Sequence, residues 1–103
     1  MNSFNNGKIY KIQGINGGNK FIGSTSGTLK AKMISLKSDY KCWKEGKKGH
    51  NRCFDIFDRY GFNSCEITLI ELVNVETKKE LDERLSDYIA VYKNVVNKNY
   101  KFN

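Results

Sequence analysis

A glycine- and asparagine-rich turn between two β-prone runs is the feature that most restricts the fold of this chain. Residues 8–13 and 20–24 are rich in isoleucine, tyrosine and phenylalanine, which favour strands. The Gly-Ile-Asn-Gly-Gly-Asn segment between them supplies residues that tolerate positive φ angles, as a short hairpin connection requires. We therefore expect an antiparallel β-hairpin in the first quarter of the chain.

The segment after the hairpin has the spacing of a short amphipathic helix. Leu29, Met33 and Leu36 recur at i, i+4 and i+7, and Thr28 precedes them as an N-cap. The lysine-rich stretch 38–50 that follows has no clear period. We expect a basic loop or a frayed helix end there, with its single tryptophan packed inward rather than stacked on a ligand.

The second half of the chain predicts helix, strand and helix. Asn51 is the expected N-cap of the first helix and Gly61 its stop, and the apolar run 65–73 suits a strand in the middle of a sheet. Thr77 and Glu80 form a T-x-x-E capping box ahead of an apolar stripe. The resulting order is β-β-α-α-β-α. It predicts one α+β domain over residues 1–103, with a small, mainly antiparallel three-stranded sheet flanked by helices.

The charge balance favours a polyanionic partner. The 103 residues carry a formal net charge of +7, which is typical of proteins that bind nucleic acid. Lysine and asparagine are abundant throughout and proline is absent, so the position of the charge matters more than its total. One segment concentrates it, and its cations are the expected nucleic-acid contacts, with double-stranded DNA as the leading partner: Lys37, Lys41, Lys44, Lys47, Lys48 and Arg52.

The cysteines do not suggest a disulfide framework or a zinc site. Cys42, Cys53 and Cys65 are odd in number, widely spaced and without a C-x-x-C pair. A set of Cys42, His50 and Cys53 could ligate a metal, but a lone histidine in a lysine-rich loop is more often solvated. We therefore expect reduced, mostly buried thiols and no bound metal.

The distribution of apolar residues argues against a membrane protein. No apolar run approaches the length of roughly 18 residues that a membrane span needs, and the polar first residues lack the apolar core of a signal peptide. We expect a soluble, intracellular protein.

Four ordered segments resemble the GIY-YIG nuclease family. KIY at 8–10 and FIG at 21–23 are similar to its two hairpin motifs, and FIGSTSGTLKAKM is similar to the strand and first helix that follow. ELDERLSDYI and VVNK resemble the later helix and the closing segment. The resemblance implies the GIY-YIG fold, and a family that hydrolyses phosphodiesters with one divalent metal.

Mapped position by position, the resemblance implies a catalytic site that has lost most of its groups. Tyr10 keeps the first motif's tyrosine, but Phe21 lacks the hydroxyl of the second. Lys32 stands where the family has an arginine and Leu36 where several members have a histidine. Leu85 replaces the metal-binding glutamate, and its spacing places it in the apolar stripe of the last helix, so we expect its side chain to be buried in the core.

Some polar positions of the family site survive and could still contact a phosphate. Besides Tyr10 and Lys32, they are Ser24, Thr25 and Asn97. Each has an ordinary structural alternative: Tyr10 as a packed strand aromatic, Lys32 as a surface lysine, and Asn97 as a turn residue that bonds its own backbone.

Three functional hypotheses follow from these residues. The first is a catalytically degenerate GIY-YIG-type domain that binds nucleic acid through its basic surface without cutting it. The second is an active or weakly active endonuclease that holds Mg²⁺ through a displaced carboxylate such as Asp82 or Asp87. The third is a protein-interaction or structural domain whose charge faces an acidic partner.

Overall fold

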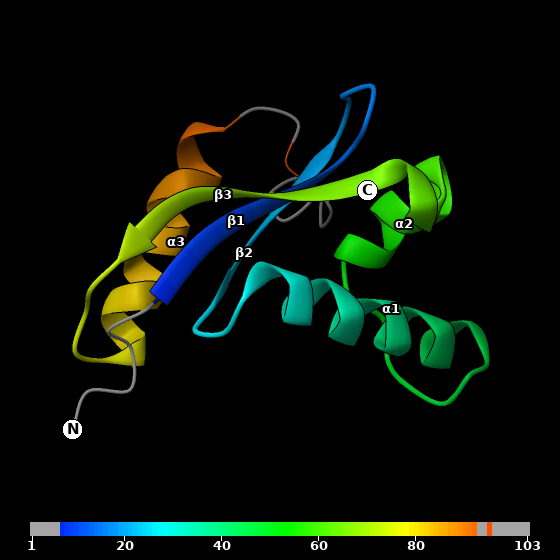
Figure 1. Cartoon of the computed structure of the whole chain (residues 1–103), viewed down its shortest axis with the longest axis horizontal. Helices are drawn as coiled ribbons and strands as arrows, with labels where there is room; N and C mark the ends of the chain where they lie inside the picture. Colours follow the sequence, from blue (N-terminus) through cyan, green and yellow to red (C-terminus); the bar gives the residue numbers. More distant parts are fainter. Residues whose placement is uncertain (1–6, 93–94, 96–103) are drawn as a thin grey trace.

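The computed structural model describes residues 7–92 and 95 and confirms the predicted β-β-α-α-β-α order (Figure 1). Within that part of the chain, no helix is both long and apolar enough to cross a membrane. The elements are β1 (Gly7–Gly14), β2 (Lys20–Thr25), α1 (Leu29–Lys44), α2 (Cys53–Tyr60), the short 3-10 helix η1 (Phe62–Ser64), β3 (Cys65–Val73) and α3 (Lys78–Val91).

The sheet has β1 at its centre and the order β2-β1-β3, with both pairings antiparallel. Tyr10 lies opposite Gly23 of β2 and Leu69 of β3, and an irregularity in the β1–β3 register falls between Ile9 and Tyr10. The prediction that residues 65–73 form a central strand is therefore wrong. The central place goes to β1 because its side chains are covered on both faces, whereas most side chains of β3 are exposed or half-buried.

Two apolar clusters lie on opposite faces of the sheet. Ile9 and Tyr10 are neighbours in β1, so their side chains leave opposite faces. Tyr10 belongs to the cluster under α1 and α2, whose buried members are Tyr10, Ile12, Leu36, Cys53, Phe54, Ile56 and Phe57. Ile9 belongs to the cluster under α3, whose buried members are Ile9, Ile22, Val73, Leu81 and Val95. In Figure 1, α3 is accordingly separated from α1 and α2 by the strands.

The helix ends agree with the expected signals at three of four places, including Gly61 as the C-cap of α2. Thr28 Oγ1 accepts a hydrogen bond from the Ala31 N–H at 3.0 Å, and Thr77 forms a complete capping box with Glu80. Asn51 was predicted as the N-cap of α2, but Arg52 holds that position. The Asn51 carboxamide instead accepts from the Cys53 N–H at 3.0 Å, because its short side chain reaches the backbone two residues on.

The first helix extends further than its apolar spacing predicts. It continues to Lys44, through part of the stretch expected to be a loop or a frayed end. The cause is aromatic packing in its last turns, where Tyr40 lies 5.3 Å from Phe57 and Trp43 stacks at 5.3 Å on Phe54. The tryptophan packs inward, as predicted.

Tyr60 at the end of α2 holds the hairpin turn against the helix. Its hydroxyl accepts a hydrogen bond from the Asn19 N–H at 3.0 Å, and its ring lies against Gly14. Gly18 adopts a φ of 97°, and a side chain there would overlap the Tyr60 hydroxyl. The turn therefore needs glycine both for its backbone angle and for space.

Candidate functional site

The two hairpin motifs form one packed unit on the face of the sheet that α1 and α2 cover. Tyr10 is 2% exposed, and its ring centroid lies 6.5 Å from that of Phe21. The Tyr10 ring also covers Gly23, where a Cβ would stand 2.5 Å from the Tyr10 Cζ atom. Burial raises the pKa of the Tyr10 hydroxyl well above its ordinary value, with a smaller contribution from Cys53. The phenol therefore stays protonated at neutral pH.

The two α1 positions of the implied family site lie close to this unit. Leu36 is buried in the same cluster as Tyr10. Lys32 is half-buried, and its charge acts on Cys53, another member of that cluster. The pKa of the Cys53 thiol is raised to about 12, mainly by burial. The positive charge of Lys32 acts in the opposite direction and lowers that pKa. The fold thus brings Tyr10, Phe21, Lys32 and Leu36 to one face.

Leu85 lies apart from that group. It is half-buried on α3 and packs against the cluster that contains Ile9 and Ile22, on the other face of the sheet. Its place in the apolar stripe is as predicted, but the expectation that it is buried is wrong, because Leu85 packs against the cluster from outside rather than within it. The two carboxylates considered as substitutes are both exposed, and Asp82 is paired with Lys78 at 3.1 Å.

Of the remaining phosphate candidates, Thr25 has an ordinary local role. Ser24 and Thr25 are half-buried at the end of β2. The Thr25 hydroxyl accepts from the Gly27 N–H at 3.2 Å, which orders the turn into α1. Asn97 lies outside the described residues.

The basic segment carries fewer uncommitted charges than its sequence suggests. Three of its lysines form exposed ion pairs: Lys44 with Asp58 at 3.0 Å, Lys47 with Glu45 at 3.2 Å and Lys48 with Asp39 at 3.6 Å. Among the described residues, no carboxylate pairs with Lys37 or Lys41, and both lysines are exposed. Exposed pairs are weak, so the paired lysines can still turn toward a phosphate.

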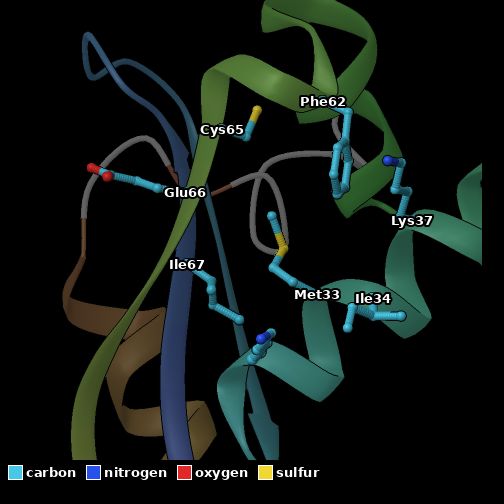
Figure 2. A pocket seen from close by; sticks show the side chains of 8 residues that line it. Met33, Ile34, Lys37, Phe62, Cys65, Glu66 and Ile67 are labelled. Atoms are coloured by element: carbon cyan, nitrogen blue, oxygen red, sulfur yellow. The ribbon is translucent and has the colours of Figure 1, made fainter.

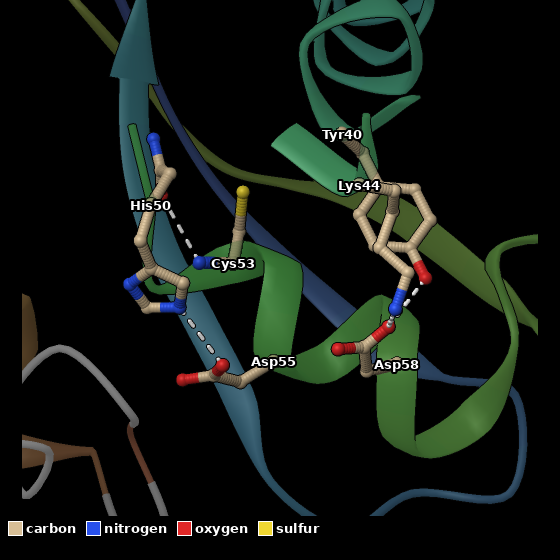
Figure 3. Close-up of polar contacts among 7 residues, drawn as sticks. Tyr40, Lys44, His50, Cys53, Asp55 and Asp58 are labelled. Carbon is tan, nitrogen blue, oxygen red and sulfur yellow. Dashed lines mark hydrogen bonds and ion pairs between the residues drawn. The ribbon is translucent and has the colours of Figure 1, made fainter. Parts of the chain in front are cut away.

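Polar contacts between α1, the loop after it and α2 hold this basic segment in place (Figure 3). Asp58 accepts from the Tyr40 hydroxyl at 2.6 Å and from the Lys44 ammonium at 3.0 Å. One turn earlier on α2, Asp55 contacts His50 at 2.9 Å. The Tyr40 hydrogen bond lowers the pKa of Asp58, with help from Lys44, and raises the pKa of Tyr40 to about 12.

These contacts were not foreseen from the sequence, although the spacing of Asp55 and Asp58 on one amphipathic helix offered a hint. They also bear on the metal set considered for Cys42, His50 and Cys53. The Cys53 thiol points away from the His50 ring in Figure 3, and the imidazole is committed to Asp55. Across residues 7–92 and 95, no group of three or more His, Cys, Asp or Glu side chains is placed to hold a metal ion.

Comparison with known proteins identifies the architecture. No family model and no curated protein matches the sequence. A search of solved structures finds a mutant of the catalytic domain of the intron endonuclease I-TevI, with a TM-score of 0.57. The match covers 82% of this chain and 81% of that one at 20% sequence identity. This chain has a GIY-YIG-like fold. The structural match confirms the architecture that the four sequence segments implied. The domain is therefore nuclease-like in its fold.

Proposed function

We propose that this GIY-YIG-like domain binds nucleic acid, with duplex DNA as the leading ligand, and does not cleave it. The observation that carries the proposal is a row of exposed lysines on α1 of a nuclease-like fold. Lys30, Lys37, Lys41 and Lys44 recur at intervals of seven, four and three residues, so they share one side of the helix. We call these four residues the α1 lysine row.

The geometry of the row suits a phosphate backbone. Lys37 and Lys44 are two turns apart, which is about 10 Å along a helix and comparable with a few phosphate steps of a nucleic-acid strand. Lys47 and Lys48 extend the row into the loop beyond α1. Tyr40 and Asp58 fasten the end of the helix to α2, so the row is presented on a fixed surface rather than on a free loop.

The absence of cleavage rests on the residues that occupy the implied catalytic positions. Phe21 has no hydroxyl, Leu36 has no proton to transfer, and Tyr10 is buried with a raised pKa. Leu85 contributes a hydrocarbon where the family has a metal ligand. General acid–base help alone is worth roughly 10²–10⁴-fold in rate, so losses of this kind take a small nuclease out of measurable range.

Binding is tested with a fluorescein-labelled 20-base-pair duplex by anisotropy over a range of salt concentrations. Lys37→Glu with Lys41→Glu removes two lysines that have no carboxylate partner in the described structure, and should weaken binding at least about tenfold. The matched control is Lys78→Glu with Lys79→Glu at the start of α3, which makes the same charge change outside the row. The slope of log K against log [salt] should fall by about 0.9 for each lost phosphate contact.

Equal loss of affinity in the two double variants would show that net charge, rather than the α1 lysine row, governs binding. No binding even at low salt would remove the nucleic-acid proposal and favour a protein-interaction role. Cleavage is tested separately with supercoiled plasmid and Mg²⁺ or Mn²⁺, where we expect no nicking. EDTA-sensitive nicking that Tyr10→Phe abolishes would establish the active endonuclease instead.

A further inference from the structure

An open cavity of about 500 Å³ lies between the first turns of α1 and the start of β3 (Figure 2). Its walls are mostly apolar, and two lysines of the α1 lysine row stand among them. The lining residues are Lys30, Met33, Ile34, Lys37, Phe62, Cys65, Glu66 and Ile67. The volume falls within the range of roughly 300–1,000 Å³ that small-molecule sites occupy.

The cavity combines an aromatic ring with two cations at a fixed separation. Phe62 is held in place by an edge-on contact with Phe57 at 4.8 Å, and the Lys37 ammonium lies 5.4 Å from the centre of the Phe62 ring. Lys30 and Lys37 are seven residues apart on α1, which places their backbones about 10 Å apart. Ile34, 62% exposed, lies between them in sequence.

The β3 wall offers main-chain groups. In Figure 2 the Ile67 side chain points toward Met33, whereas the Glu66 carboxylate points away from the cavity. β3 is an edge strand, and in the described part of the chain it pairs with β1 alone. The N–H and C=O groups on its outer side are therefore available as hydrogen-bond donors and acceptors beside an apolar floor.

We propose that this cavity receives one unpaired base of a nucleic-acid strand, while Lys30 and Lys37 hold the phosphates on either side of it. This inference rests on the proposed nucleic-acid binding and adds a preference for single-stranded segments. Proteins that bind single strands combine a cationic track with aromatic side chains that stack on bases. An acidic peptide could also pair with the two lysines. However, Lys30 and Lys37 belong to the α1 lysine row, so a nucleic-acid strand bound along that row would pass over the cavity. We therefore favour a nucleic-acid base over an acidic peptide as the occupant.

The test compares three labelled DNA hairpins that have the same duplex stem: one blunt, one with a three-nucleotide thymidine overhang, and one with an abasic overhang of equal length. The abasic overhang keeps the phosphates and removes the bases. We expect the thymidine overhang to bind about tenfold more tightly than the abasic one, in line with the contribution of base–aromatic stacking.

Two variants locate the effect. Ile34→Glu places a carboxylate at the cavity. Its control is Ile15→Glu in the protein's β1–β2 turn, since Ile15 has nearly the same exposure, 61%. Phe62→Leu keeps an apolar side chain and removes the ring. Ile34→Glu and Phe62→Leu should each abolish the difference between the thymidine and abasic overhangs. Ile15→Glu should preserve that difference.

Each outcome separates this inference from the proposed function. Equal affinity for the thymidine and abasic overhangs, with normal binding of the blunt hairpin, would overturn the base site and leave the proposed function standing. No binding of any hairpin at low salt would overturn both. An alternating Glu-Val peptide that displaced the overhang hairpin but not the blunt one would reassign the cavity to an acidic peptide. Circular dichroism melting of each variant confirms that the folded protein is being compared.

Discussion

Replacing Gly23 by alanine should destabilise the protein because the Tyr10 ring already occupies the space a side chain needs. An added Cβ would overlap the Tyr10 hydroxyl, lie 2.5 Å from its Cζ atom and stand 3.0 Å from the Phe21 Cε2 atom. The Tyr10 side chain is 2% exposed and packs among core residues under α1 and α2, so it cannot swing into solvent. The glycine of the second hairpin motif is therefore required by packing.

The expected cost follows from the typical price of inserting a methyl group into a packed core, about 1–3 kcal/mol. In a domain of this size each kcal/mol lowers the melting temperature by roughly 4–8 °C. We therefore expect Gly23→Ala to melt about 5–20 °C below the parent. The same free-energy loss should appear as a lower midpoint in urea with an unchanged slope.

Gly49→Ala is the matched control, because nothing lies within 4 Å of a Cβ at that position. It should be neutral or slightly stabilising, since alanine restricts the unfolded chain. A double-mutant cycle with Tyr10→Leu then isolates the overlap between residues 10 and 23, because leucine lacks the hydroxyl and the Cζ atom that an added Cβ at position 23 would meet. Equal melting of Gly23→Ala and Gly49→Ala, or strictly additive effects in the cycle, would refute the packing argument.

Three further expectations concern single contacts. Tyr60→Phe removes the acceptor for the Asn19 N–H, so it should cost about 1 kcal/mol and speed amide exchange at Asn19. The parent should be more stable than Tyr40→Phe up to about pH 10, the ordinary pKa of tyrosine, and this difference should decline as the pH rises through about 12. Urea unfolding at a series of pH values measures the difference. A difference that does not change with pH would argue against the Asp58 contact. Leu85→Glu should lower the free energy of unfolding by about 1–3 kcal/mol, and added Mg²⁺ should not restore the melting temperature of the variant. A higher melting temperature with Mg²⁺ would reveal a metal site.

The local elements of the fold were predictable because their signals are local. The hairpin follows from its glycine-rich turn, and the last helix from the Thr77–Glu80 capping box. The place of β3 was not predictable, because an apolar run does not say which of its neighbours will cover it. The length of α1 was underestimated for a related reason: its last two turns are held by rings from α2, and the apolar spacing within α1 does not reveal these contacts.

The candidate site was only partly predictable. The grouping of Tyr10, Phe21, Lys32 and Leu36 on one face agrees with their places in the motifs, which set strand and helix positions. The partners of the basic segment could not be anticipated, because Asp58 reaches Lys44 only after α2 folds back on α1. The same folding creates the cavity beside Phe62, whose lining comes from two separate stretches of chain, 30–37 and 62–67.

The central position of β1 sets the order in which the sheet can assemble. The hairpin partner β2 follows after a short turn, whereas the pairing of Gly7 with Val73 and Gly14 with Cys65 closes loops of more than about 50 residues. Such distant pairing makes folding slow, and until β3 arrives one edge of β1 stays open to pairing with another molecule. We expect a chain truncated after Ser64 to associate through that edge, seen as concentration-dependent sedimentation. During synthesis, the emerging hairpin is therefore exposed to aggregation until β3 has been made.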